Sequence, residues 1–569
     1  MQERWITDWP TSRRFPHYTR ANAGEVLADP VSPLGWTFGW DGGIVAGYKA
    51  GLIRCGVYED SDFDPEHPES VACFGGYLYI NLSAIRMQGA RNPAATVEIL
   101  DTAFFGDHPD VPPYEAHPDD DKPHLLPAIE AHTAWVLSGD DWSELDVDRA
   151  DAAALRDSRG DLSAPTDVDL VARARTAQAR LPHLFSQHVV SGTSAAVAPG
   201  LLAVVAQALD EPGLAMTVLS GLGDVDSADA SYALWDLSRM VAHDPALTAA
   251  FDEGVDGVLD RVDSATFRDA WDAFLYQFGS RGPDEWDICS PTWESHPRLA
   301  LAALDRVRLQ KDDESPRLRN GERKRQRDAL ISQARGRLVE QPDIAGLLEA
   351  GITAGTMMAN RERTKTTIVR VMHEARMAFR ELGRRNGHAD LVFQLLDSEL
   401  DHYVQDPHSF TQRLTDRRSR WKELFDLQPP FIIADGEVPP LTQWPRRNAH
   451  MVDLAAEGDV LRGVSGSPGI ARGIARIILD PGDPVGLQPG DVLVAPNTDP
   501  SWTPLFMSAS AVVVDVGGQI SHAMIVSREL GVPCVVSVTN GTRRIPDGAL
   551  IEVNGTDGTV AVLSKGTST

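Results

Sequence analysis

Apolar residues near the C-terminal end of the chain fall in two short runs separated by glycines. Residues 512–514 are all valine, and residues 532–538 form a second run rich in valine. Between them lie the pair Gly517-Gly518 and a stretch that starts at His522 and stops at Gly531. Runs of β-branched residues favour strands, and glycine commonly ends a helix. The pattern predicts a strand, a glycine turn, a short helix and a second strand.

Helical periodicity dominates the middle of the chain, from residue 167 onwards. Residues 196–209 are apolar and rich in alanine, and residues 230–242 place leucines at helical spacing. A helix is also predicted over about 358–385, because apolar residues recur there every three or four positions. The members of this stripe are Ile368, Met372, Ala375, Phe379 and Leu382.

Three other regions have less regular patterns. Residues 1 to about 100 mix short aromatic runs with turn residues, and residues 101–165 are rich in Asp, Pro and His, which predicts an exposed loop or insertion. A proline-rich passage over residues 427–460 predicts a hinge linker. We therefore expect a mainly α-helical (α+β) domain over residues 1–426, the linker, and a small α/β domain over residues 461–569.

Composition narrows the class of protein. The chain has 569 residues, too many for one core, and its net charge is −29. Such an acidic chain argues against nucleic acid or an anionic membrane as a partner. The N-terminus has no signal-peptide pattern and no apolar run reaches the length of a membrane span, so we expect a cytoplasmic protein.

Cysteine and histidine spacing predicts no metal site. The four cysteines form no CxxC pair and fit a reducing compartment: Cys55, Cys73, Cys289 and Cys534. Residues 108–124 contain three histidines near an aspartate run, but the prolines and irregular spacing match no standard ligand pattern. We interpret that stretch as a solvated loop.

His522 is the first candidate for chemistry. Ser521 can cap a helix whose first residue is His522. The unpaired N–H groups at a helix N-terminus disfavour an imidazolium and favour a bound anion, so the ring would be neutral, nucleophilic and able to carry a phosphoryl group. The alternative is a capped surface histidine after a tight turn.

The segment GGQISHAMIVSRELGVP, residues 517–533, resembles the phosphohistidine signature of the phosphoenolpyruvate-utilising enzymes, among them rifampicin phosphotransferase and phenylphosphate synthase. Spaced matches extend from Gly463 to Gly558. The resemblance implies a swivelling domain in which His522 is the phosphocarrier, with Gly517, Gly518 and Ser521 at the phosphate.

A second resemblance lies in residues 274–293, FLYQFGSRGPDEWDICSPTW. It is similar to the family segment written with Gly-His-Arg-Gly, then Glu, Asp and Pro-Arg-Trp. Arg281, Glu285 and Asp287 match, whereas Ser280 replaces the family histidine. The resemblance assigns these three residues to the catalytic site, and the alternative is a structural ion cluster.

Charged residues continue the apolar stripe of the 358–385 helix towards its start. Arg361 and Lys365 fall on its core-facing side, where a charge is costly unless it meets a partner. Their Arg-x-x-x-Lys pattern also resembles the family's phosphate site. The alternative is a snorkelling pair at the helix end. Glu285, Asp287 or His373 is the candidate general base.

Together these features predict a dikinase-type phosphotransferase component. No Walker A pattern occurs, and we expect the family's ATP-grasp nucleotide domain to be missing, so ATP and Mg²⁺ would be bound by a separate ATP-grasp partner and no cofactor by this chain. The acceptor would be a hydroxyl of a small organic molecule, with Trp36, Trp40, Phe74 and Tyr77 hinting at an apolar or aromatic one. The alternative function is a non-catalytic binding or regulatory relative.

Overall fold

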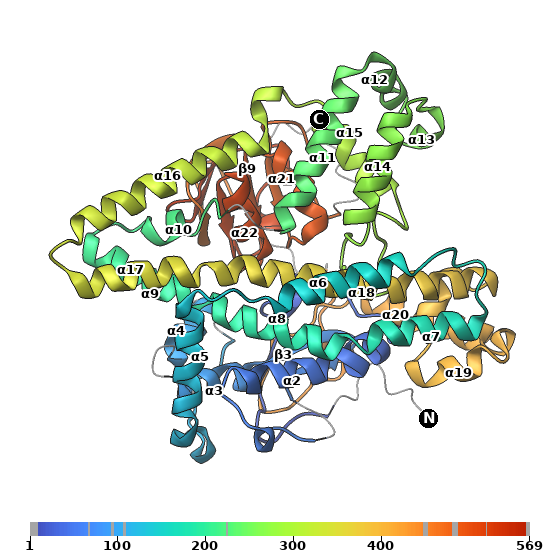
Figure 1. Ribbon diagram of the computed structural model, residues 1–569, viewed down its shortest axis with the longest axis horizontal. Helices are drawn as coiled ribbons and strands as arrows, with labels where there is room; N and C mark the ends of the chain where they lie inside the picture. The colour runs from blue at the N-terminus through green and yellow to red at the C-terminus, as the bar shows by residue number, and fades with distance from the viewer. Residues whose placement is uncertain are drawn as a thin grey trace. The chain divides into compact units, whose positions relative to one another are not determined.

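The computed structural model describes residues 10–65, 69–92, 96–105, 110–222, 226–447, 453–480, 487–518 and 521–564. Contacts divide the chain into two compact units, each assembled from separate stretches of sequence, and Figure 1 labels their main elements. Unit 1 consists of Met1–Ser194, Asp284–Ser290 and Arg363–Met451. Unit 2 consists of Ala195–Pro283, Pro291–Glu362 and Val452–Thr569.

Unit 1 combines helices with a small antiparallel sheet of strand order β2-β3-β1-β4. Its strands are β1 (Tyr18–Thr19), β2 (Val71–Phe74), β3 (Tyr77–Asn81) and β4 (Ile432–Ile433). Its helices are α1 (Ala23–Val26), the π-helix Gly35–Ile44, α2 (Val45–Arg54), α3 (Leu82–Arg91), α4 (Val97–Phe105), α5 (Leu126–Ser138), α6 (Glu144–Asp157), α7 (Asp167–Gln178), α8 (Leu181–Ala195), α19 (Leu400–Tyr403) and α20 (Thr411–Leu424).

The proline-rich passage is not a free linker over its first part. Strand β4 pairs with β1 in the sheet of unit 1. Trp444 is buried against Tyr77, and the Tyr77 hydroxyl donates a hydrogen bond to the Leu427 carbonyl at 3.0 Å. The prediction was wrong for residues 427–447, because isolated aromatic and aliphatic side chains bury well without any periodicity. Residues 448–452 lie outside the described residues, and Ala455 is already buried in unit 2.

Unit 2 begins with helices that pack on one another, α17 on α9 and α11 on α12, α14 and α15. These helices are α9 (Val197–Leu209), α10 (Leu214–Val218), α11 (Asp226–His243), α12 (Pro245–Asp252), α13 (Val258–Arg261), α14 (Ala265–Phe278), α15 (Arg298–Val307), α16 (Pro316–Arg337) and α17 (Pro342–Ala354). The long helix α18 (Thr356–Arg385) starts in unit 2 and continues into unit 1.

The C-terminal α/β region, residues 453–564, forms a sheet of order β5-β12-β11-β7-β8-β9-β10-β6 in the described part of the chain. Strands β7, β8, β9 and β10 run parallel to one another, whereas β7 pairs with β11 and β10 pairs with β6 in antiparallel fashion. The elements are β5 (Val460–Arg462), β6 (Val464–Ser467), β7 (Ile470–Ile477), β8 (Val492–Ala495), α21 (Thr503–Ser508), β9 (Ala511–Val514), α22 (His522–Leu530), β10 (Cys534–Val536), α23 (Gly541–Arg544), β11 (Leu550–Asn554) and β12 (Thr559–Ser564).

The central strands of this sheet are buried on both faces, which explains their continuous apolar runs. Val492 and Val494 face one apolar cluster, whereas Leu493 and Ala495 face another. The second cluster contains side chains of α21 and α22 and also of α11, α14 and α15. The C-terminal α/β region therefore shares an apolar core with the helices of unit 2.

The predicted elements around His522 are confirmed as β9, α22 and β10, and the stripe helix is confirmed as α18, with every member of its stripe buried. The acidic stretch 101–165 is only partly a loop. Helices α5 and α6 occupy much of it, because Leu145, Ala152 and Leu155 bury one side of α6 while its acidic residues face outwards. The predicted mainly helical chain with a C-terminal α/β region is confirmed.

The observed units differ from the predicted domains. The expected domain over residues 1–426 is divided between both units, and the helices of residues 195–283 and 291–362 group with the C-terminal α/β region. One stretch, Asp167–Leu209, is long and apolar enough to span a membrane by length and composition, but half of its most apolar window is buried in the fold. Core helices of soluble proteins have the same property.

Candidate active site

His522 is the first residue of α22, at the carboxyl ends of the parallel strands. Ser521 is the N-cap, and its Oγ accepts a bond of 3.5 Å from the Met524 N–H. Gly531 ends the helix in the left-handed conformation, with φ of 68°. The site thus lies in the loops beyond β8 and β9, the edge at which open α/β sheets commonly bind ligands.

Two hydroxyl groups hold the imidazole of His522. Thr498 Oγ1 lies 3.3 Å from Nδ1, and Thr503 Oγ1 lies 3.2 Å from Nε2. Phe506 packs edge-on against the ring, and His522 is only 8% exposed. Since a hydroxyl can donate or accept, these two contacts orient the ring whichever nitrogen carries the proton.

The glycine turn before α22 is tightly packed. A Cβ on Gly517 would lie 3.0 Å from Val536 Cβ and 3.2 Å from Ser521 Oγ, so this position has little room for a side chain. The Gly517 carbonyl accepts a 2.6 Å bond from the Ser537 hydroxyl, and the Gly518 carbonyl accepts one from the Ser521 N–H. Residues 519 and 520 of the signature lie outside the described residues.

A half-buried aspartate and a buried arginine lie next to the turn and the helix. Asp515, at the end of β9, accepts bonds from the N–H and hydroxyl of Thr542, yet burial raises the pKa of its carboxyl to about 6. Arg528 of α22 donates to the Gly466 carbonyl at 2.9 Å, and burial lowers the pKa of its guanidinium to about 10. Both groups connect α22 and β9 to the rest of the sheet.

Helix α16 contacts the C-terminal end of α22. The Asn320 side-chain amide donates to the Glu529 carboxylate and to the Glu529 carbonyl, each at 3.0 Å. The Arg323 guanidinium donates to the carbonyls of Pro468 and Gly531. The carrier helix is therefore docked on the helices of unit 2 in this conformation.

The residues predicted from the 274–293 segment divide between the units. Arg281 lies in unit 2, where it is 2% exposed and its main chain bonds to Phe278 and Trp293. Glu285 and Asp287 lie in unit 1. Arg361, in unit 2, pairs with Glu362 at 3.1 Å.

Lys365 and Glu285 come together in unit 1. Lys365 Nζ lies 3.5 Å from Glu285 Oε1, and the Glu285 side chain is fully buried. A buried pair needs further bonds to offset the desolvation of both charges. The pair places a cation from α18 against the Asp284–Ser290 loop.

Asp287 is an anchor for that loop. Its carboxylate accepts bonds of 2.6 Å from both the N–H and the hydroxyl of Ser32, and one of 3.0 Å from the Cys289 N–H. A Cβ on Gly35 would lie 2.2 Å from Asp287 Oδ1, so glycine is needed there. Burial raises the pKa of this carboxyl. Because its oxygens already accept three bonds, we do not retain Asp287 as the base.

His373 is also set aside as a base. It is 1% exposed, and its Nδ1 lies 3.3 Å from a guanidinium nitrogen of Arg376. Arg376 itself donates to the main-chain carbonyls of Glu285 and Asp287 at 2.9 and 3.0 Å. Burial lowers the pKa of the Arg376 guanidinium to about 10. Arg376 therefore holds the loop against α18, and His373 contacts Arg376.

Sequence patterns alone assigned no role to four residues that hold the site: Thr498, Thr503, Ser32 and Arg376. The two threonines stand inside the motif Thr498-Asp499-Pro500 with Trp502-Thr503-Pro504, so a match to the family was visible but gave no role. Ser32 has no such signal, because its partner Asp287 is 255 positions away.

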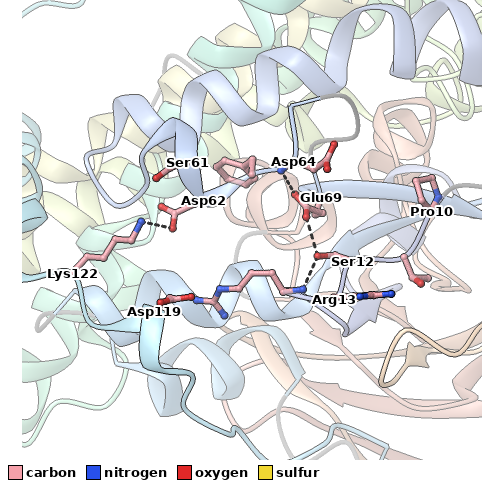
Figure 2. A pocket seen from close by; sticks show the side chains of 12 residues that line it. Pro10, Ser12, Arg13, Ser61, Asp62, Asp64, Glu69, Asp119 and Lys122 are labelled. Carbon is pink, nitrogen blue, oxygen red and sulfur yellow. Dashed lines mark hydrogen bonds and ion pairs between the residues drawn. The ribbon is translucent and has the colours of Figure 1, made fainter.

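A cleft of about 660 Å³ lies in unit 1, away from all predicted site residues (Figure 2). Lys122 reaches Asp62 at 2.8 Å, and Glu69 joins the Ser12 hydroxyl to the Asp64 N–H. Lys122 and Asp62 thus already pair with each other, and the Glu69 carboxylate already accepts two bonds. Across the described residues, no three His, Cys, Asp or Glu side chains are grouped as for a metal ion.

Comparison with known proteins identifies two regions. Residues 185–362 match the fourth domain of rifampicin phosphotransferase, and residues 487–558 match the mobile domain of the PEP-utilising enzymes. The second match contains His522 and both threonines, and the first contains Arg281, Glu285 and Arg361.

Curated relatives match about three fifths of the chain. A rifampicin phosphotransferase of Streptomyces sviceus is 33% identical over 61% of this chain and 41% of its own length. The prodigiosin synthesizing transferase PigC of Serratia marcescens is 29% identical over 62% of this chain and 40% of its own length. The uncharacterized phosphotransferase YvkC of Bacillus subtilis is 28% identical over 60% and 42%. The chain spans about two fifths of the length of these relatives.

Proposed function

We propose that the chain is a phosphotransferase component of the PEP-utilising, rifampicin phosphotransferase type, to which its two matched regions are similar, with His522 as the phosphocarrier. His522 receives a phosphoryl group and delivers it to a hydroxyl of a small organic acceptor. The observation that carries this proposal is the imidazole at the start of α22, held between Thr498 and Thr503.

The chemistry follows from that position. A neutral imidazole offers a nitrogen lone pair to phosphorus, and the positive end of the helix dipole stabilises the added negative charge. Gly517 lets the turn pack closely on Val536 and Ser521, and Ser521 caps the helix. The ring is already oriented before phosphate arrives, which lowers the entropy cost of transfer.

The receiving site requires positive charge. Phosphoryl transfer is accelerated mainly by positioning and by neutralising the oxygens of the transferred group. Lys365, beside Glu285, is our first candidate for this task, and Arg361 precedes it by four positions on α18. Arg281 is the third candidate.

The nucleotide is assigned to a partner. The sequence contains no Walker A pattern, and an ATP-grasp protein would bind ATP and Mg²⁺. Its β-phosphoryl group would pass to His522 and its γ-phosphoryl group to water, leaving AMP. The carrier region would then leave its contacts with α16, because a carrier must visit two sites.

The buried aromatic residues near the N-terminus do not define the acceptor. Trp36, Trp40, Phe74 and Tyr77 are each at most 4% exposed, so these aromatic residues are core and give no support for an aromatic acceptor. Relatives are named for rifampicin and for prodigiosin, and both names concern those proteins. An organic hydroxyl remains the proposed acceptor.

The alternative is a relative that keeps the fold without transfer. Ser280 in place of the family histidine favours it, whereas the intact cap and oriented ring of His522 oppose it. Labelling with β-³²P-ATP and γ-³²P-ATP in the presence of an ATP-grasp protein decides between them. We expect acid-labile label on the chain from the β-position alone. Absence of label from both, with an ATP-grasp protein that forms AMP, would contradict the proposal.

A further inference from the structure

The stretch between α15 and the first turns of α16 contacts both helices of the His522 site. At its start, the Gln310 side-chain amide donates to the Met507 carbonyl at 2.6 Å and to the Ser508 hydroxyl at 3.2 Å. Met507 and Ser508 end α21, and the first residue of this helix is Thr503, which contacts the His522 ring. Gln310 is 5% exposed, so it holds α21 from inside the fold of unit 2.

The same stretch holds α22 through two donors on α16, which lies against α22 (Figure 1). Asn320 donates to the carbonyl and to the carboxylate of Glu529, each at 3.0 Å. The Arg323 guanidinium donates to the Gly531 carbonyl at 3.3 Å and to the Pro468 carbonyl at 3.1 Å. Helix carbonyls at a C-terminal end lack partners within the helix and attract cations. Donors from α16 therefore satisfy the end of the helix that begins with His522.

These bonds are of a kind that can break and re-form. Most of their acceptors are main-chain carbonyls, which exchange a protein donor for water at a small net cost that changes an equilibrium by about fivefold per bond. The Gln310 Oε1 atom is buried and has no hydrogen-bond partner among the described protein atoms. Water would reach this oxygen once α21 separates, which favours release. The polar bonds thus set the position of both helices and remain reversible.

We propose that Gln310, Asn320 and Arg323 form a latch that holds the carrier region in a resting position, an inference that rests on the proposed function above. In this position His522 is buried and both of its ring nitrogens contact hydroxyl groups. A partner protein needs access to a ring nitrogen, so phosphorylation proceeds from the released population. Release uncovers the faces of α21 and α22 that pack on α11 and α16. The three residues act through these helices and are positioning residues.

The first test weakens the latch. Arg323→Met keeps the apolar stem of the side chain and removes the donors to Gly531 and Pro468. The released population increases, so an ATP-grasp protein with β-³²P-ATP should label His522 about five- to tenfold faster. Damage to the fold would slow labelling, so the direction of the change separates a latch from a structural defect. Arg325→Met, whose guanidinium pairs with Glu322 within α16, is the matched control and should label as the wild type does.

The second test locks the latch. A Cβ on Gly531 would lie 3.5 Å from the Cβ of Arg319, a separation that a disulfide bridges. The double variant Arg319→Cys/Gly531→Cys should label at less than about a tenth of its reduced rate when it is oxidised, and reductant should restore the rate. Each single cysteine variant controls for the change of residue, since Gly531 has a φ of 68°.

Amide hydrogen exchange of α22 in the full chain tests the latch without any partner. Exchange should be faster in Arg323→Met than in the wild type and unchanged in Arg325→Met. Equal exchange and equal labelling for Arg323→Met and the wild type, or equal labelling of the oxidised and reduced double variant, would overturn the latch. If the wild type takes no label while exchange in Arg323→Met rises as expected, the carrier function fails and the docking contact stands, which is a different result.

Discussion

The surroundings of His522 and the Asp284–Ser290 loop are built in opposite ways. The ring of His522 meets Thr498 and Thr503, which are 24 and 19 positions away. The loop is held by Ser32, 255 positions from Asp287, and by Arg376, 91 positions from Glu285. The first site is local in sequence and the second is assembled by the tertiary fold. A motif therefore describes the carrier well and the receiving loop poorly.

The two regions also differ in charge. Neutral hydroxyl groups contact the His522 ring, whereas buried charged groups hold the loop. Lys365 pairs with the Glu285 carboxylate, and Arg376 donates to the Glu285 carbonyl. Buried ions fix geometry at a high desolvation cost. We interpret the first region as a reactive group that must travel, and the second as a rigid support that stays in place.

The largest effect should follow from Asp287→Ala, which strands the Ser32 and Cys289 donors in the core. Each unsatisfied buried donor costs about 1–3 kcal/mol, so we expect a loss of about 3–5 kcal/mol in the free energy of unfolding. Urea titration measures it. Asp60→Ala, an exposed partner of Lys49, should change stability by less than about 1 kcal/mol. Equal costs for the two variants would show that the loop is not a rigid support.

Asp515→Asn should have a smaller, pH-dependent effect on stability. Burial raises the pKa of Asp515 to about 6 from 3.8, so its neutral form is favoured in the folded state. The contribution of Asp515 to the free energy of unfolding is fully present below pH 3.8. It falls by about 3 kcal/mol at most as the pH rises through 6. We expect the Asn variant to exceed the wild type by about 1–3 kcal/mol at pH 8, and the difference to shrink by pH 5. Parallel stability curves over this range would contradict this account.

Thr503→Val should have the smallest effect and should change only the rate at which His522 is phosphorylated. This change removes one of the two hydroxyl groups that orient the His522 imidazole. The loss should raise the barrier to phosphorylation by about 1 kcal/mol, so His522 should be phosphorylated up to about tenfold more slowly. Thr559→Val, on β12, is the control for a threonine replacement in the same sheet. If neither variant differs from the wild type in initial labelling rate, the hydroxyl contacts do not orient the ring.

Much of the fold followed from periodicity, and the exceptions have physical causes. The stripe of α18 and the turn–helix at His522 have strong local signals, a repeated apolar spacing and a cap with its terminal glycine. Residues 427–447 have neither, because their burial depends on Trp444 and Ile433 meeting a sheet far away in sequence. Helix α6 was hidden by its acidic outer face.

The residues of the candidate site could be predicted only where they lie close together in the sequence. His522, Ser521 and Gly517 could be named because strand, turn and cap are consecutive. The role of Asp287 could not, because only the fold shows that Ser32 occupies its carboxylate.

The most direct test of the central claim is the location of the phosphoryl group itself. The full chain is incubated with an ATP-grasp protein and β-³²P-ATP, and the label is tested for stability in acid and base. The account predicts acid-labile, base-stable label on the wild type and on His183→Asn, and none on His522→Ala. Equal labelling of His522→Ala would show that another residue carries the phosphate and would contradict the account.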